Sequence, residues 1–165
     1  MEILVIVIVL VFFLVLALPV ISGPPYVPTL KLNIDSALDL LDLKPGQTLL
    51  DLGCGDGRVL IAAAKRGINV VGIEISPIMA LLAYFRTRKY RKHVKVRIVW
   101  GNYFLSHWPK ADAVFGFMIQ YQMRKLDKRI EVWHDRPVRL ASFAFRIPGK
   151  KEVASKDAVF LYEYK

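Results

Sequence analysis

Hydrophobic residues occupy the start of the chain without a single charged position. Residues 3–22 consist mainly of Ile, Val, Leu and Phe. As a helix this segment would extend roughly 30 Å, which matches the hydrocarbon core of a bilayer. The alternative, a cleaved signal peptide, requires a basic n-region and a small-x-small cleavage site, and neither is clear in the sequence. The pattern therefore favours an uncleaved transmembrane anchor over residues 1–22.

The charges on either side of this segment predict its orientation. No lysine or arginine precedes it, whereas Lys31 and many other basic residues follow it. Positively charged flanks stay in the cytoplasm, so the N-terminus is expected outside. We therefore expect a single-pass membrane protein whose remaining residues lie on the cytoplasmic side.

A proline-rich connector follows the apolar segment. Residues 23–29 read GPPYVPT, and the three prolines fix the backbone φ angle and remove hydrogen-bond donors. Such a stiff segment would hold Tyr26 and Thr29 in a defined, extended arrangement, although the composition fits a plain linker equally well. The expected organisation is an anchor (1–22), a connector with this motif (23–35) and a globular domain (36–165).

Beyond the connector, strand-like and helix-like patterns alternate. The expected strands cover residues 49–52, 69–73, 94–100, 111–117, 138–147 and 158–164. The expected helices lie around residues 37–41, after Gly57, from 77 to about 90, and around 123–133. This alternation predicts an α/β fold with a Rossmann-like, doubly wound and mostly parallel sheet.

Two of these helices carry capping signals at their start. Asp35 or Ser36 is expected to cap the first, and Ser76 followed by Pro77 is expected to cap the third. The third helix ends in the basic run RTRKYRK at residues 86–92. Cations suit the C-terminal end of a helix dipole, so a solvated face is the first interpretation, and contact with anionic lipid headgroups is the second.

Composition narrows the classes of site. The 24 lysines and arginines exceed the 14 acidic residues, and the formal net charge of +10 attracts nucleic acid, acidic proteins or anionic lipid. The single cysteine, Cys54, excludes an internal disulfide and a multi-cysteine metal site, and its place among glycines suits packing. The three histidines are scattered, so no metal site is expected.

The stretch TLLDLGCGDGRVLIAAAKRG, residues 48–67, carries the pattern with the most chemical content. An apolar strand leads into three alternate glycines, Gly53, Gly55 and Gly57, and a helical pattern follows. Glycines allow positive φ and let bare backbone approach a ligand, while the helix start offers unpaired N–H groups. This is the first half of a nucleotide-binding βαβ unit.

The surroundings of the turn separate two ligand classes. A dinucleotide fingerprint reads GxGxxG, whereas Gly57 is followed here by Arg58. Asp51, just before the turn, would repel a pyrophosphate but suits a ligand that carries an ammonium group. Glu74 ends the second strand, where a carboxylate can accept hydrogen bonds from both hydroxyls of a ribose. Together these residues favour S-adenosylmethionine over a dinucleotide.

LLDLGCGDG followed by VVGIEIS resembles the motifs of class I S-adenosylmethionine-dependent methyltransferases, over nearly all of residues 25–165. The resemblance implies that Glu74 holds the ribose and that Asn102 faces the adenine, where many members have Asp. It places Gln120 among the residues that line cofactor and substrate. It also implies that four residues surround the methionine part of the cofactor: Asp51, Gly53, Gly55 and Gly57.

A narrower resemblance rests on PYVPT, the preceding hydrophobic segment and the short C-terminal end. These features are similar to the membrane-associated protein-lysine methyltransferases of mitochondria, which modify the ATP synthase c subunit and the adenine nucleotide translocase, and to their prokaryotic relatives. In that family the PYVPT-like motif is associated with activity, which implies roles for Tyr26 and Thr29. FGFMIQYQM resembles the segment after strand four, with Ile119 in place of a usual proline.

The chemistry of methyl transfer to an amine completes the hypothesis. The amine must be neutral to attack, whereas a lysine has a pKa of about 10.4, and Tyr26, Thr29 and Gln120 are the candidates to position it. We expect a membrane-anchored protein-lysine methyltransferase that acts on a membrane-associated protein. The alternatives are a nucleic-acid or small-molecule methyltransferase and a non-catalytic cofactor-binding protein. Nucleic acid is not favoured, because the chain has no appended RNA-binding module and no NPPY-type motif.

Overall fold

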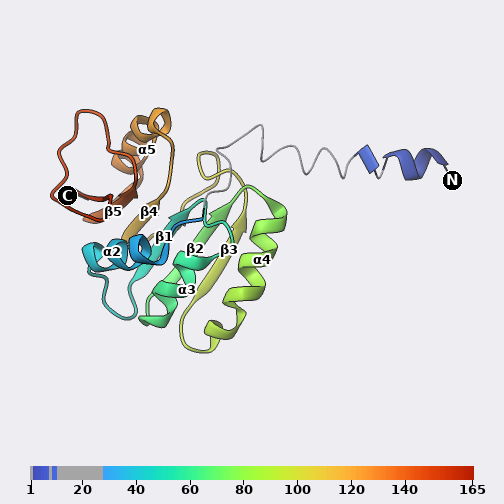
Figure 1. The fold of residues 1–165 in the computed structure, drawn as a ribbon, viewed down its shortest axis with the longest axis horizontal. Helices are drawn as coiled ribbons and strands as arrows, with labels where there is room; N and C mark the ends of the chain where they lie inside the picture. The colour runs from blue at the N-terminus through green and yellow to red at the C-terminus, as the bar shows by residue number, and fades with distance from the viewer. Residues whose placement is uncertain (1, 8, 11–27) are drawn as a thin grey trace.

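The computed structural model describes residues 2–7, 9–10 and 28–165 (Figure 1). Most of the predicted anchor over residues 1–22 and the first part of the connector, residues 23–27 with Tyr26, lie outside these ranges. Within the described ranges, no helix combines the length and the apolar character that crossing a bilayer needs.

Seven strands form one mixed sheet in the order β3-β2-β1-β4-β5-β7-β6. Five of them pair in parallel: β1 (Thr48–Leu52), β2 (Asn69–Glu74), β3 (Val96–Trp100), β4 (Ala113–Gly116) and β5 (Val138–Phe143). β7 (Val159–Tyr164) is antiparallel to both β5 and β6 (Ala154–Lys156). The predicted Rossmann-like α/β sheet is confirmed, and it is mixed at its C-terminal end.

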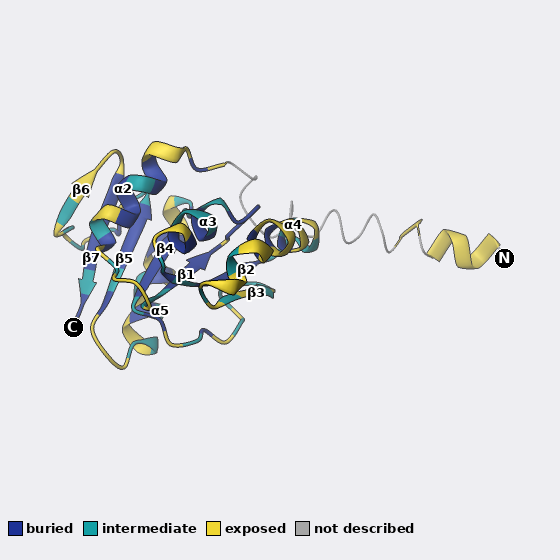
Figure 2. Ribbon diagram, turned by 90° about the horizontal axis from the view of Figure 1, so that it is seen from below, coloured by how far each residue is buried: buried dark blue, intermediate teal, exposed yellow. Residues whose placement is uncertain are grey.

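Helices cover both faces of this sheet (Figure 2). α2 (Lys31–Leu41), α3 (Arg58–Lys65) and α4 (Pro77–Thr87) contribute to the core on one face. α5 (Gln120–Trp133) contributes to the core on the other face. Successive residues of β1 alternate between the two, since Leu49 belongs to the first core and Leu50 to the second.

α2 begins earlier than predicted. Its N-cap is Leu30, so the expected capping by Asp35 or Ser36 is wrong. Both residues lie inside the helix and make long-range contacts: Asp35 pairs with Arg66, and the Ser36 hydroxyl donates to the Asp157 carboxylate. The apolar residues Ala37, Leu38 and Leu41 of this helix are buried.

α4 begins as predicted. The Ser76 side chain accepts a hydrogen bond from the Met79 N–H at 3.4 Å, and Pro77 is the first helical residue. The α-helix ends at Thr87 and continues as a 3₁₀-helix, η1 (Arg88–Lys92), rather than running as one helix to residue 90.

The C-terminal strands differ most from the expectation. β5 ends at Phe143, short of the predicted residue 147, and Ala144 follows with φ of 68°. β6 and β7 form a tight hairpin around Asp157 and Ala158, whose φ values of 49° and 59° fit a type I′ turn. That turn is usually marked by Asn-Gly or Asp-Gly, and neither pair occurs here, so β6 could not be predicted.

Candidate active site

The glycine turn lies between β1 and α3, at the carboxyl ends of the parallel strands (Figure 1). Gly53, Gly55 and Gly57 have φ values of 84°, 53° and 81°, which side-chain-bearing residues rarely adopt. The Gly53 N–H donates to the Ile73 carbonyl oxygen at 2.8 Å and so attaches the turn to the end of β2. The predicted strand–turn–helix unit is therefore present.

Two glycines allow close packing around the turn. A Cβ on Gly57 would lie 3.1 Å from the Cβ of Ala83, so the absence of a side chain lets α3 approach α4. A Cβ on Gly72 would lie 2.6 Å from the Cys54 sulfur. Cys54 is buried, and burial raises the pKa of its thiol well above the usual range. These contacts support the packing role predicted for Cys54.

Glu74, the last residue of β2, faces the glycine turn. Its Oε2 accepts a hydrogen bond from the Gly55 N–H and its Oε1 accepts one from the Ser76 N–H, both at 2.8 Å. A carboxylate oxygen has two lone pairs, so each oxygen keeps an acceptor position for a further donor. The Glu74 side chain is thus fixed by backbone donors and can still bind two hydroxyls.

Asp51 lies beneath the turn and is only 1% exposed. Its Oδ2 has no hydrogen-bond partner among the described residues. Burial raises the pKa of this carboxyl well above its usual range, and the nearby charges of Glu74 and Asp56 raise it further. A buried carboxylate without a partner is costly, so the site calls for a cationic or hydrogen-bond-donating group from a ligand.

Asp56, inside the turn, is satisfied by two arginines. Arg58 donates to its two carboxylate oxygens from Nε and Nη2, each at 3.0 Å, and Arg86 donates to Oδ2. Burial opposes ionisation of Asp56, but the hydrogen bonds and charges of the two arginines outweigh it and lower the pKa to about 2. The site therefore combines a paired carboxylate inside the turn, on Asp56, with an unpaired carboxylate oxygen beneath it, on Asp51.

Thr29 brings the end of the PYVPT motif to the site. It is buried, and its carbonyl oxygen accepts a hydrogen bond from Arg58 Nη1 at 3.2 Å. The end of the motif is therefore attached to the glycine turn. Tyr26, the aromatic residue of the motif, lies outside the described residues, so its expected role stays a prediction.

A tyrosine that the sequence did not single out lies over the turn. A Cβ on Gly53 would be 3.8 Å from Cε1 of Tyr103. The Tyr103 hydroxyl donates to Gln122 Oε1 at 3.0 Å, and burial, with a contribution from Tyr121, raises the Tyr103 pKa to about 12. Tyr103 belongs to no motif, and although Gln122 lies in FGFMIQYQM, nothing in that segment marks its contact with a residue 19 positions earlier, so only the fold could identify the pair.

Asn102 lies just after β3, and Gln120 is the first residue of α5, the helix that follows β4. The Gly101 N–H donates to the Glu74 carbonyl at 2.8 Å, which places Asn102 next to the end of β2. Asn102 Oδ1 accepts from the Phe104 N–H at 2.8 Å and caps the following turn. Gln120 is exposed at the start of α5, and its Nε2 donates to the Arg146 carbonyl at 3.2 Å. Neither contact tests the roles predicted for Asn102 and Gln120.

The residues at the carboxyl ends of the parallel strands fit S-adenosylmethionine. Among the described residues, no three His, Cys, Asp or Glu side chains are grouped as metal ligands. Asp51 offers an unpartnered carboxylate oxygen for an ammonium group, and Glu74 offers acceptors for a ribose. The glycine turn exposes backbone between them.

Comparison with known proteins agrees with this arrangement. Residues 51–154 match the family model described as the ANTKMT methyltransferase domain. A protein-lysine N-methyltransferase of Saccharolobus islandicus is 32% identical over 149 residues, covering 84% of this chain and 92% of that protein. The human lysine N-methyltransferase of the ATP synthase c subunit is 27% identical over 124 residues, covering 75% of this chain and 53% of that protein. The chain spans about half the length of this relative and its vertebrate counterparts.

A solved structure extends the comparison to cofactor binding. An RNA methyltransferase from Salinibacter ruber, in complex with S-adenosyl-L-homocysteine, superposes with a TM-score of 0.75 at 26% identity. The match covers 84% of this chain and 92% of that one. The fold is therefore that of a class I methyltransferase. Since the family model covers most of the described domain, this chain belongs to the ANTKMT methyltransferase family.

Proposed function

We propose that this protein is an S-adenosylmethionine-dependent protein-lysine N-methyltransferase whose acceptor is a membrane or membrane-proximal protein. The observation that carries the cofactor part is the buried, unpartnered Oδ2 of Asp51 beside the glycine turn. The lysine acceptor is supported by the protein-lysine N-methyltransferase of Saccharolobus islandicus, because the match covers 84% of this chain and 92% of that protein.

In this proposal the cofactor supplies an electrophilic methyl group, and the protein supplies its binding site. Asp51 binds the ammonium group, whose positive charge stabilises the ionised carboxylate. Glu74, held by the N–H groups of Gly55 and Ser76, accepts hydrogen bonds from the ribose hydroxyls. Asn102, next to the end of β2, would contact the adenine. Together these residues would hold the cofactor in a single orientation.

The acceptor amine must reach the methyl group in its neutral form. Tyr26, Thr29 and Gln120 are the candidates to orient it, and the Tyr103–Gln122 pair joins them because Tyr103 lies over Gly53. The Tyr103 hydroxyl donates to Gln122, so its oxygen lone pairs can accept a hydrogen bond from an amine N–H. A pKa of about 12 keeps this phenol neutral at physiological pH. Alignment, rather than a strong base, is then the main contribution of the protein.

The membrane part of the proposal rests on the apolar segment at residues 3–22. A single-pass anchor with the domain on the cytoplasmic side would raise the local concentration of an acceptor in the same membrane. Several relatives are lysine N-methyltransferases of the ATP synthase c subunit, so an ATP synthase c subunit is the first acceptor to examine.

The test is to incubate the full chain with S-adenosylmethionine labelled in its methyl group and with membranes from the source cells. A labelled protein band, with methyl-lysine identified by mass spectrometry, supports the proposal. Label in RNA or small molecules alone would overturn the lysine acceptor. Cofactor binding without transfer to any fraction would support the non-catalytic alternative. Tyr26→Ala should preserve cofactor binding and reduce transfer, whereas unchanged turnover would make GPPYVPT a plain linker.

A second candidate function, RNA methylation, is favoured by two observations. The Salinibacter ruber structure that superposes on most of this chain is an RNA methyltransferase, and the net charge of +10 would attract nucleic acid. The same labelling experiment, carried out with total RNA in parallel, separates the two. Label in RNA that resists protease and is lost on ribonuclease treatment would establish this alternative.

A further inference from the structure

Much of α4 is exposed (Figure 2). Its exposed side carries large apolar side chains. Ala80, Ala83 and Thr87 form its buried side, and all three are small. The opposite side holds four residues at the spacing i, i+3, i+4 and i+7, each between 41 and 57% exposed: Ile78, Leu81, Leu82 and Phe85. A helix on the surface of a soluble protein normally shows the reverse pattern, with its apolar stripe inward.

A cluster of cations continues this stripe at its C-terminal end. Between residues 77 and 93 the chain has five lysines and arginines and no acidic residue. Four of them lie in η1, where no residue is buried: Arg88, Lys89, Arg91 and Lys92. Within the part of the chain that the structure describes, none of these four makes an ion pair with a carboxylate. Their charges are therefore free to interact with an external anion.

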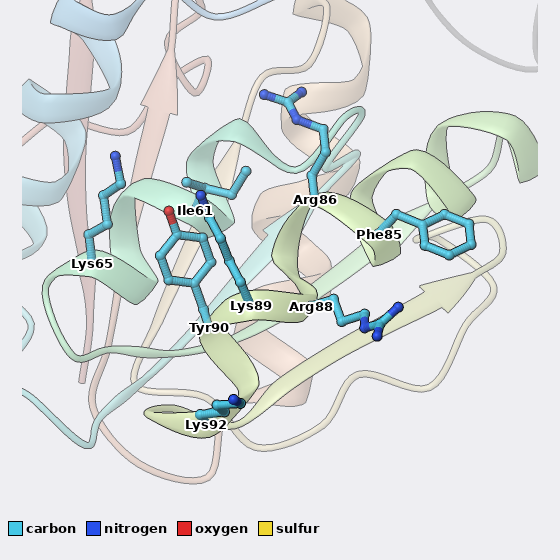
Figure 3. Close-up of a pocket in the computed structure, with 8 residues that line it drawn as sticks. All are labelled: Ile61, Lys65, Phe85, Arg86, Arg88, Lys89, Tyr90 and Lys92. Atoms are coloured by element: carbon cyan, nitrogen blue, oxygen red, sulfur yellow. The ribbon is translucent and has the colours of Figure 1, made fainter.

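The basic cluster and the stripe meet at a surface hollow of about 700 Å³ (Figure 3). Ile61, Phe85 and Tyr90 supply its apolar part, and the remaining lining residues are basic. The Lys89 ammonium lies 5.2 Å from the centre of the Tyr90 ring. The hollow is thus lined by both apolar and cationic side chains.

Two exposed aromatic side chains add to this surface, Tyr84 on α4 itself and Trp100 beside the residues that precede the helix. Tyr84 is 41% exposed, and the Arg91 guanidinium lies 4.2 Å from the centre of its ring. Trp100, at the end of the edge strand β3, is 67% exposed, and its Nε1 donates to the Ile75 carbonyl. Tyr and Trp side chains that pair an apolar ring with a polar contact are typical of membrane–water interfaces.

We propose that the outer surface of α4 and η1 binds an anionic membrane, with the apolar stripe in the acyl boundary and the basic cluster among the lipid phosphates. Charge complementarity selects this occupant. Two copies of the chain would bring two basic clusters together, which opposes self-association. Nucleic acid would satisfy the cations and could stack on the aromatic rings, but it would leave the aliphatic side chains of Ile78, Leu81 and Leu82 without an apolar partner. A lipid surface satisfies both halves of the pattern.

This surface is joined to the candidate active site. α4 starts at Pro77, directly after Ser76, whose N–H donates to Glu74. Docking of α4 would therefore hold the rim of the site close to the headgroups, where a lysine of a membrane protein could enter. The inference goes beyond the proposed function, because lipid binding by this surface does not require methyl transfer.

The test uses the full chain with a single environment-sensitive fluorophore on Leu81→Cys. Cys54 is buried, and unsubstituted protein treated with the same reagent measures any labelling there. Vesicles are made of phosphatidylcholine alone or of an equimolar mixture with phosphatidylglycerol, each containing a brominated quenching lipid. The apolar segment at residues 3–22 is the same in both experiments, so the difference between the two vesicles reports the α4 surface.

We expect quenching at position 81 to be at least about threefold greater in the anionic vesicles, because basic residues near the surface add to the apolar attraction. A matched label on Val132→Cys, which is also exposed but lies on α5, should show no such difference. Replacing Arg88, Lys89, Arg91 and Lys92 by serine should reduce quenching at position 81 to the level in neutral vesicles. None of these four side chains is buried, so the circular dichroism spectrum should not change.

Three outcomes would overturn the proposal. Equal quenching at positions 81 and 132 would show that α4 does not contact lipid. If an RNA oligonucleotide buried the fluorophore at position 81 and vesicles did not, the surface would be a nucleic-acid-binding surface. Burial that rises with protein concentration without lipid would identify an interface between copies. Binding of S-adenosylhomocysteine by the labelled protein would keep each of these results separate from a failure of the proposed function.

Discussion

Arg58 donates a hydrogen bond from Nη1 to the backbone carbonyl oxygen of Thr29, at 3.2 Å. The same side chain binds the carboxylate of Asp56 inside the glycine turn. One arginine therefore connects the end of the PYVPT motif to the turn that is proposed to bind the cofactor. A residue placed in this way can transmit the position of the turn to the segment that is proposed to orient the acceptor.

Arg58→Ala should reduce methyl transfer more than cofactor binding. Hydrogen bonds to charged groups contribute about 1.5–3 kcal/mol, which corresponds to a loss of about 10- to 100-fold in kcat/KM for the protein acceptor. Asp56 keeps its contact with Arg86, so the turn retains one partner. The measurements are the Kd for S-adenosylhomocysteine by calorimetry and the kinetics of transfer.

Arg66→Ala is the matched control, because Arg66 pairs at the surface with Asp35 and Asp39. Exposed ion pairs of this kind contribute about 0–1 kcal/mol, and activity should be preserved. If Arg58→Ala weakened cofactor binding as much as it reduced transfer, its effect would be on the turn itself and not on the PYVPT motif.

Glu74→Ala should abolish measurable cofactor binding. The substitution removes a charged acceptor for the ribose and also the acceptor for the N–H groups of Gly55 and Ser76. Glu74→Gln keeps one oxygen and the side-chain shape, so we expect an intermediate loss of about 10- to 100-fold in affinity. Calorimetric titration with S-adenosylhomocysteine measures both variants. Wild-type affinity in Glu74→Ala would show that the ribose is bound elsewhere.

Because the pKa of Asp51 is raised in the free protein, we expect cofactor binding to release a proton. Burial and neighbouring carboxylates raise the pKa of Asp51 in the free protein. An ammonium group placed beside it favours the charged form, so binding lowers this pKa and affinity should increase as pH rises through the free-protein value. Calorimetry in two buffers with different ionisation enthalpies detects the released proton. Asp51→Asn should bind more weakly and release none; proton release that persists in this variant would assign the proton to another group.

The carboxyl group of Asp51 should also make the free energy of unfolding depend on pH. Because its pKa is higher in the folded than in the unfolded protein, where it is about 3.9, its contribution to stability is complete below that value. The contribution is lost as pH rises through the raised folded-state pKa. The Asp51→Asn variant has no such titratable group. Its free energy of unfolding should therefore depend less on pH between the unfolded-state and folded-state pKa values of Asp51. Urea unfolding at a series of pH values tests this, and parallel curves for both proteins would contradict it.

Local patterns were sufficient to predict most of the fold. β1, the glycine turn, β2 and the Ser76 cap each follow from residues adjacent in sequence, because the turn conformation and the helix start are set by near neighbours. The capping of α2 failed for the opposite reason. Ser36 and Asn33 are polar because they hold Asp157, more than 120 residues away, at the turn of the β6–β7 hairpin.

In the candidate site, too, the sequence could identify some residues and only the fold could identify others. Asp51 and Glu74 could be identified because they flank a motif with fixed spacing. The contacts Arg58–Thr29 and Tyr103–Gln122 join residues from different loops and helices, so no periodicity or spacing records them. Gln122 rather than Gln120 lies against Tyr103 because the helical turn at the start of α5 directs the two side chains apart.

Gly57→Ala should destabilise the protein more than Gly149→Ala, although both residues have nearly the same φ, 81° and 82°. A left-handed backbone costs a non-glycine residue about 1–2 kcal/mol at either position. At Gly149 nothing lies within 4 Å of a new Cβ, whereas at Gly57 the Cβ and Cα of Ala83 would lie at 3.1 and 3.2 Å. The backbone atom of α4 cannot rotate away, so overpacking should add about 1–3 kcal/mol. Urea unfolding without cofactor measures the difference; equal destabilisation would mean that α4 yields to the new methyl group and that only the φ angle requires glycine at position 57.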